Sequence, residues 1–221
     1  ADVRVHTPFM KASENMSSQE WKKIAKLTAR SLNNPEVKGV IIAHGTDTLH
    51  YTGAALSFML GKINKPVVLT YSQRSSDRGS SDSRLNLVCA AHTALSNIAE
   101  IMLVGHANLD DNYCYAFQGN KCRKMHTSRR DTFKAINTNS IAKIFPDGRI
   151  ELLRKQFHTR NKNKVIADTV FDDKVALLTF YPGQSPDILS YYHKKKYKGI
   201  VIAMTGLGHI LTEGKHNWLP H

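Results

Sequence analysis

Gly39-Val-Ile-Ile-Ala43, followed directly by His44-Gly-Thr-Asp-Thr48, sets the architecture expected of this chain. The first segment is a short continuous apolar run rich in β-branched residues, which is typical of a strand buried on both faces of a sheet. The polar segment behind it leads into a helical pattern. A buried strand that ends in a polar turn and passes into a helix is the first half of a strand–helix–strand unit.

The same alternation extends along the chain. Ser17 and Glu20 stand at capping-box spacing and begin a helix that should end near Asn33. Further strands are expected at 66–69 and 101–104, each preceded by a helix. Two helix faces are expected to pack on the sheet, one made of Ala54, Ala55 and Phe58 and the other of Val88, Ala91, Leu95 and Ile98. The pattern predicts an α/β fold whose parallel sheet has helices on both faces.

The rhythm is lost between about residue 150 and residue 172 and then restarts. A strand at 175–180, a helix opening at Ser185-Pro186 and a strand at 199–203 follow. We therefore expect an N-terminal α/β domain over 1–155, a linker over 156–172, and the start of a smaller C-terminal α/β domain over 173–221.

The composition is strongly basic, with 31 Lys and Arg against 18 Asp and Glu and a net charge of +13. The excess gathers at 121–134, 154–164 and 194–198. Such clusters either attract a polyanion such as tRNA or form a solvated basic surface, and charge alone leaves both open. No apolar run approaches the roughly 20 residues of a membrane helix. The absence of a visible signal peptide and the three unpatterned cysteines favour the cytoplasm.

The segment 44–48 is the strongest candidate for chemistry. In open α/β sheets, ligands bind beyond the carboxyl ends of the strands, where this segment should lie. Gly45 would let the backbone approach a ligand, while two hydroxyls and a carboxylate converge on a small site. The alternative is a plain strand-to-helix turn in which Thr46 or Asp47 caps the helix.

His44-Gly-Thr-Asp-Thr48 is similar to a signature of the bacterial-type L-asparaginase family, and two further segments match in the same order. Ser13-Glu-Asn-Met16 resembles the family's contact to the α-carboxylate and α-amino groups of the substrate, and Arg123–Ser128 resembles its lysine segment. The segments 73–78 and 124–133 resemble the branch of the family that releases ammonia within archaeal tRNA-dependent amidotransferases.

This resemblance implies a role for each matching residue. Thr46 would supply a hydroxyl nucleophile or position a water, and Lys124 would lower its effective pKa. Asp47 would bind the α-ammonium group of glutamine or asparagine. The remaining contacts to the substrate would come from Ser13, Glu14, Gly45 and Ser72. No metal or organic cofactor is implied in this chain, whereas ATP and Mg²⁺ are expected in a companion subunit, and a homodimer is expected.

The chain also departs from the family pattern. The family's Thr-Gly-Gly-Thr-Ile segment is absent, so we expect a fragment that lacks both ends and is a poor catalyst alone. Tyr71-Ser72 replaces a usual Gly-Ala pair, which predicts restricted access for the substrate side chain. Two alternatives to the amidotransferase subunit stay open at this stage. One is a free-standing cytoplasmic L-asparaginase, and the other is a nucleic-acid-binding module that has lost catalysis.

Overall fold

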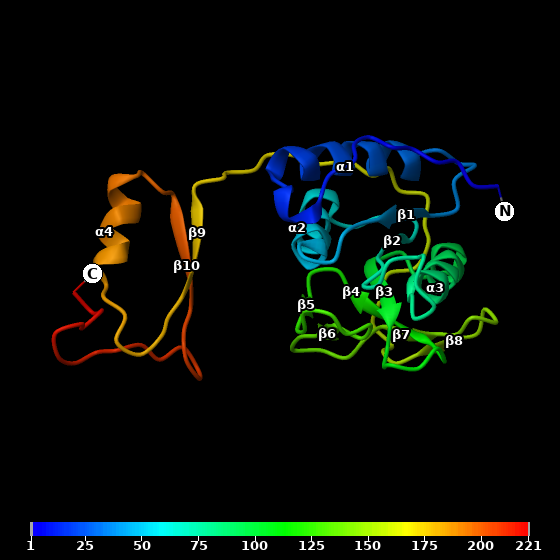
Figure 1. Ribbon diagram of the computed structural model, residues 1–221. Coiled ribbons are helices and arrows are strands. Elements are labelled where there is room, and N and C mark those ends of the chain that lie inside the picture. The colour runs from blue at the N-terminus through cyan, green and yellow to red at the C-terminus, as the bar shows by residue number, and fades with distance from the viewer. Residues whose placement is uncertain (1, 221) are drawn as a thin grey trace. The chain divides into compact units, whose positions relative to one another are not determined.

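A six-stranded sheet with the order β1-β2-β3-β4-β7-β8 organises the first part of the chain in the computed structural model, which describes residues 2–220 (Figure 1). Its parallel half consists of β1 (Val40–Ala43), β2 (Val67–Thr70) and β3 (Ile101–His106). Its antiparallel half consists of β4 (Cys114–Gln118), β7 (Ala142–Ile144) and β8 (Ile150–Leu152). The α/β class is confirmed, and the antiparallel extension is a feature that the alternation did not predict.

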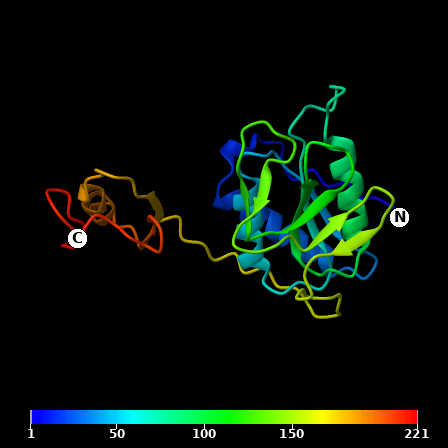
Figure 2. The same cartoon turned by 90° about the horizontal axis from the view of Figure 1, so that it is seen from below.

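Helices cover both faces of this sheet, as expected (Figure 2). A short 3-10 turn, η1 (Ser13–Asn15), precedes α1 (Ser18–Leu32), which begins at the predicted capping box. The helices α1 and α2 (Leu49–Leu60) pack with Val67 and Leu69 on one face of β2. On the opposite face, α3 (Ser83–Leu95) packs with Val68. Neighbouring residues of β2 therefore point into two different cores, as the pleat of a strand requires.

The packing faces expected for α2 and α3 were wrong. Phe58 is 77% exposed, and the buried face of α2 is instead made of Leu49, Thr52, Gly53, Leu56, Met59 and Leu60. In α3 the side chain of Leu95 is 54% exposed, whereas Asn86, Cys89, Ala90, Thr93 and Ala94 are buried. The small residues of α3 let it lie close to the sheet, since a Cβ on Gly39 would stand 2.3 Å from the carbonyl oxygen of Ala94.

The strand β1 is not buried on both faces, which corrects the expectation for residues 39–43. It lies at the edge of the sheet, hydrogen-bonded to β2 alone among the described strands, and Ile41 is 38% exposed. The two inner parallel strands, β2 and β3, are fully buried. The apolar composition of β1 therefore reports its sheet character correctly but not its place in the strand order.

The boundary between the two units of the chain lies between Thr169 and Val170. Residues in the expected linker over 156–172 instead pack on the first unit, which corrects the start of that linker. Val165 is buried, and its backbone N–H and carbonyl both bond to the Asn33 side chain, at 2.9 and 2.8 Å. In the second unit β9 (Val175–Thr179) pairs in parallel with β10 (Gly199–Ala203), and α4 (Asp187–Lys194) lies between them in sequence.

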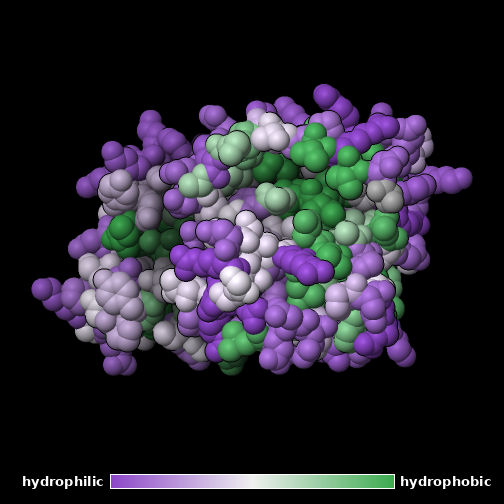
Figure 3. Space-filling view, turned by 45° about the vertical axis from the view of Figure 1, so that its right-hand side comes forward, coloured by the Kyte–Doolittle hydropathy of each residue, from purple (hydrophilic) through white to green (hydrophobic). Residues whose placement is uncertain are grey.

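The surface carries apolar as well as charged side chains. Figure 3 shows hydrophobic residues gathered among hydrophilic ones on the face that it presents. Within residues 2–220, no helix is long and apolar enough to cross a membrane. Cys89, Cys114 and Cys122 are all buried free thiols.

Candidate active site

Thr46, Asp47 and Lys124 meet at the carboxyl edge of the parallel half of the sheet. The first two lie in the turn between β1 and α2, while Lys124 ends β5 (Cys122–Lys124), which forms a hairpin with β6 (Phe133–Ala135). The Lys124 Nζ atom lies 3.0 Å from Thr46 Oγ1 and 2.7 Å from Asp47 Oδ1. The expected placement of the lysine beside the threonine hydroxyl is confirmed, although 78 positions separate the two in sequence.

This cluster is asymmetric in its exposure to solvent. The Lys124 side chain is 13% exposed, whereas the Asp47 side chain is 61% exposed. The lysine amine is thus enclosed while the carboxylate faces outward. A largely buried ammonium group that donates to a hydroxyl stabilises negative charge developing on that oxygen more strongly than it would in bulk water.

Ser13 lies directly against the signature turn. A Cβ placed on Gly45 would be 2.8 Å from both Cβ and Oγ of Ser13, so this position needs a glycine. The Thr48 hydroxyl donates to the Ser13 carbonyl at 2.6 Å and ties the two segments together. Ser13 is buried and Glu14 is exposed at the same turn. The structure therefore brings the first predicted substrate segment to the second, and the roles of these residues stay predictions.

A hydrogen-bond chain behind Thr46 was missed by sequence reasoning. The Trp21 indole N–H donates to Thr52 Oγ1 at 2.9 Å, and Thr52 Oγ1 is 2.9 Å from His44 Nε2. The other ring nitrogen of His44 is 2.7 Å from the Gly45 carbonyl oxygen, so it must carry the proton of that bond. Burial lowers the pKa of His44, which favours this neutral tautomer. The chain holds the Gly45–Thr46 peptide in place.

Two signals in the sequence pointed toward this chain. A tryptophan that is partly buried needs an acceptor for its indole N–H, and Thr52 stands one helical turn after Thr48 on the face that packs inward. The pairing of Trp21 with Thr52 spans 31 positions, however, and depends on how α1 crosses α2. Periodicity alone does not contain that crossing.

His50 lies in the electrostatic field of the same cluster. Its pKa is lowered by burial first, and then by the positive charges of Arg123 and Lys124. Its Nδ1 atom is buried without a hydrogen-bond partner among the described residues. The ring contacts Phe133, at 6.4 Å between centroids. A neutral imidazole beside Lys124 avoids adding a third positive charge to this region.

The Tyr71-Ser72 pair does not stand as a bulky obstacle at the sheet edge. Tyr71 is buried in the core, 4.7 Å from the Phe133 ring, and its hydroxyl donates to the Arg130 carbonyl at 3.2 Å. It covers Gly105, where an added Cβ would lie 2.3 Å from the tyrosine ring. The Ser72 hydroxyl donates to the Arg74 carbonyl and to Asp82, and no described contact joins it to Thr46, Asp47 or Lys124. Its predicted contact with substrate therefore has no counterpart in these contacts.

Several of the clustered basic residues support the fold. Arg129 and Lys134 both pair with the buried Asp131, at 2.9 and 2.8 Å, and the pKa of that carboxyl is lowered to about 2, chiefly by its hydrogen bond to Arg129. Arg130 pairs with Asp111 at 2.8 Å and also donates to the Leu109 carbonyl.

In the second basic cluster, Arg160 donates to the backbone carbonyls of Lys38, Ala94 and Ser96. Lys121 and Arg123 remain exposed. The basic clusters are thus a mixture of structural ion pairs and open charge.

An α/β sheet with a Thr–Asp–Lys cluster at its carboxyl edge defines an asparaginase-type amide hydrolase. The model of the asparaginase N-terminal domain matches residues 1–158, and the chain belongs to the asparaginase family. The relatives that it matches include D-type subunits of glutamyl-tRNA(Gln) amidotransferase. In Thermococcus kodakarensis that protein is 55% identical over 211 residues, and in Pyrococcus abyssi it is 51% identical over 209 residues. These matches cover 94% and 95% of this chain but 48% of each relative.

Solved structures give the same assignment of fold. The thermostable L-asparaginase from Thermococcus kodakarensis has a TM-score of 0.81 and 29% identity, over 94% of this chain and 59% of that one. L-asparaginase I from Vibrio cholerae has a TM-score of 0.79 and 26% identity, over 94% of this chain and 60% of that one. The chain spans about half the length of the curated relatives that it matches.

Proposed function

We propose that this chain is the amide-hydrolysing part of a tRNA-dependent amidotransferase. It would release ammonia from glutamine, or from asparagine, for the amidation of glutamate carried on tRNA(Gln). The observation that carries the proposal is the Lys124 ammonium, which contacts both the Thr46 hydroxyl and the Asp47 carboxylate. The amidotransferase setting is supported by relatives at 51–55% identity that are named as part of such an enzyme.

In the proposed reaction the C–N bond of the side-chain amide breaks, water adds to the acyl carbon, and ammonia leaves. Thr46 supplies the attacking hydroxyl or positions the water that attacks. Lys124 favours the alkoxide-like state of that oxygen through its charge. The Thr46 backbone N–H is the candidate oxyanion donor, and its orientation depends on the His44 chain. Asp47, Ser13 and Glu14 hold the amino-acid end of the substrate.

The partners follow from the same proposal. A companion subunit would bind ATP and Mg²⁺ and activate the glutamate on the tRNA, and this chain would form a homodimer. The exposed Lys121 and Arg123 are the residues of the first basic cluster that remain open to tRNA or to the companion subunit. A cytoplasmic location belongs to the proposal and is supported by the three free thiols.

The test is Lys124→Met in the natural protein assembled with its companion subunit. Ammonia release from glutamine should fall by about a hundredfold or more, because a preorganised charge at the reacting oxygen is lost. Lys121→Met removes the same charge from an exposed site just before β5 and should leave turnover within about twofold. Equal turnover in the Lys124 variant and the natural protein would refute the assignment of this cluster.

A free-standing L-asparaginase is the second candidate, and the structural match to the Thermococcus kodakarensis asparaginase favours it. The two functions differ in what stimulates them. An amidotransferase subunit should transfer nitrogen from glutamine to glutamyl-tRNA when the companion subunit and ATP are present. Rapid asparagine hydrolysis with no transfer under those conditions would select the asparaginase.

A further inference from the structure

We propose that Gln73, Arg74, Ser75, Arg78 and Ser128 form a binding site for a phosphate group. They line a cavity of about 500 Å³, a volume in the range of small-molecule sites. None of them belongs to the Thr46–Lys124 cluster or to the basic clusters considered above, except that Ser128 lies within the hairpin loop of the first. The inference does not depend on the proposed function, because it rests on the chemistry of this cavity alone.

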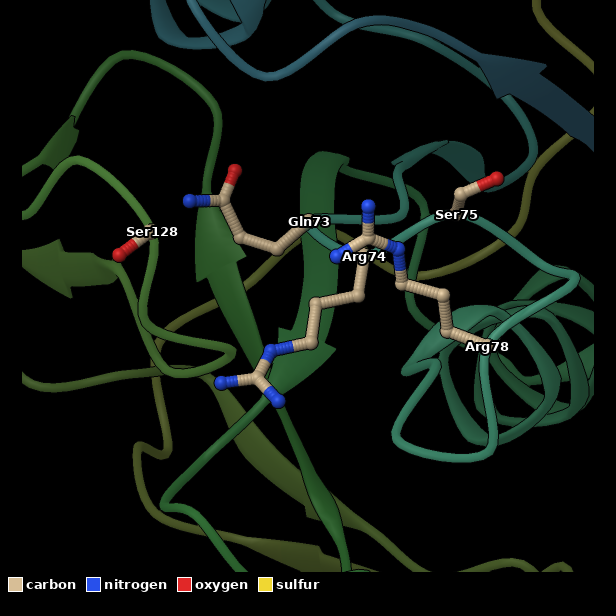
Figure 4. A pocket seen from close by; sticks show the side chains of 5 residues that line it. All are labelled: Gln73, Arg74, Ser75, Arg78 and Ser128. Atoms are coloured by element: carbon tan, nitrogen blue, oxygen red, sulfur yellow. The ribbon is translucent and has the colours of Figure 1, made fainter.

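Two loops build the cavity. Gln73, Arg74, Ser75 and Arg78 lie between β2 and α3, while Ser128 lies in the loop of the β5–β6 hairpin. The Gln73 side-chain amide donates to the Thr127 carbonyl at 2.6 Å and joins one loop to the other. Figure 4 shows the Arg78 side chain reaching back toward Arg74, with Ser128 facing them from the second loop. Donor groups therefore line both sides of one cavity.

The backbone that carries Arg74 is fixed at both of its polar groups. Its N–H donates to the buried Asp82 carboxylate at 2.9 Å, and its carbonyl accepts from the Ser81 hydroxyl at 3.0 Å. The Arg78 backbone closes two turns, donating to the Ser75 carbonyl at 3.1 Å and accepting from the Ser81 N–H at 2.9 Å. Both guanidinium groups thus extend from ordered turns, which lowers the entropic cost of binding a ligand between them.

The charge of the two arginines is not neutralised within the described part of the chain. Neither makes an ion pair there, and Asp77, the nearby exposed carboxylate, makes none with them. Asp82 does not serve this purpose, because its oxygens accept from the backbone of Gln73 and Arg74 and from the Asn86 amide. Two guanidinium groups that share a cavity without a carboxylate repel each other, and a bound anion reverses the sign of that interaction.

A phosphate group matches these donors better than a carboxylate does. Guanidinium groups bind phosphate oxygens through paired N–H donors, and a phosphate offers three or more acceptor oxygens to several donors at once. Two guanidiniums, two hydroxyls and a side-chain amide exceed what the two oxygens of a carboxylate need. The phosphate could belong to a nucleic-acid backbone or to a free phosphate or nucleotide, and the chemistry of recognition is shared.

The experiment is isothermal titration calorimetry of the natural full-length protein with inorganic phosphate at low ionic strength. Arg74→Gln and Arg78→Gln should each weaken binding by about tenfold or more, since each removes a charge-assisted donor. Both variants keep the backbone contacts of the loop, and circular dichroism checks their folding. Arg84→Gln, at an exposed position in the first turn of α3 outside the cavity, is the matched control and should change the affinity less than about twofold.

A second titration separates the two sources of the phosphate group. If a short RNA duplex competes with phosphate and its affinity falls steeply with salt, the site takes a nucleic-acid backbone. If phosphate binds and the duplex does not compete, the site takes a free phosphate or nucleotide, and both results support the site. Equal phosphate affinity in all variants, tighter binding of acetate than of phosphate, or no binding of phosphate or RNA would each overturn the inference.

Discussion

Thr52 connects two helices to the signature turn through a single hydroxyl group. It accepts a hydrogen bond from Trp21 and faces His44 Nε2, and its side chain has no exposed surface. A buried hydroxyl in such a place contributes little net energy while both of its bonds exist. Its removal is costly, because the groups that it served lose a bond without gaining access to water.

We therefore expect Thr52→Val to lower the free energy of unfolding by about 1–3 kcal/mol. The valine fills nearly the same volume, so the loss reports the hydrogen bonds and not a cavity. Urea denaturation at neutral pH measures the effect. Thr52→Ser keeps the hydroxyl and is the control; if the serine and valine variants are equally stable, the hydrogen-bond chain has no energetic role.

Sequence reasoning at the residue scale identified the signature turn but not its support. Thr46, Asp47 and Lys124 were predicted together because three segments resemble one family, and their contacts are present. The roles of His44 and Thr52 lie in contacts between elements, which adjacency in sequence does not report. Ser72 was placed at the substrate from its position after β2, yet its hydroxyl bonds within its own loop.

At the scale of elements, the alternation of strands and helices was predictable and the orientation of the helices was not. A short apolar run or a capping box is local information, so the β strands up to β3 and the start of α1 could be located. The buried face of α3 includes Asn86 and Thr93, which are polar residues satisfied by specific partners. Hydrophobicity alone assigns such residues to the solvent side and selects the wrong face.

The loop between β2 and α3 depends on Asp82, the residue that precedes α3. Its buried carboxylate accepts from the backbone N–H groups of Gln73 and Arg74. We expect Asp82→Ala to release both amides, so that hydrogen exchange at these two positions accelerates by at least about tenfold. Asp77→Ala removes a carboxylate from the exposed part of the same loop and serves as control. Unchanged exchange in the Asp82 variant would mean that the turns hold the loop without the carboxylate.

At the scale of the whole molecule, the basic composition makes stability depend on a few carboxylates. The pKa of Asp131 is about 2 because of its hydrogen bond to Arg129, and that of Glu20 is about 2 because of its hydrogen bond to Lys11. A carboxyl whose pKa is lower in the folded than in the unfolded state stabilises the fold above the unfolded value, near 4. That contribution is lost as the pH falls from about 4 through about 2.

Asp131→Asn should flatten this part of the pH profile. The free energy of unfolding of the natural protein should decline between about pH 4.5 and pH 2, and the variant should decline less because it has no proton to take up at this site. The variant should also be less stable at pH 7, where Arg129 and Lys134 lose their partner. Chemical denaturation at a series of pH values measures both effects. Asp110→Asn, at an exposed carboxylate, should leave the profile unchanged; an equal effect of both variants would point to net charge and not to the Asp131 ion pairs.

The contact between Tyr71 and Gly105 has a consequence for how this sequence can diverge. The ring of Tyr71 occupies the space that any side chain at position 105 would need, so the two positions share one volume. A lineage can replace the glycine only after, or together with, a reduction of the tyrosine. We expect homologous chains that keep a large aromatic residue at position 71 to retain glycine at 105. Chains with a small residue at 71 are released from that constraint, and the two sites should therefore change as a pair.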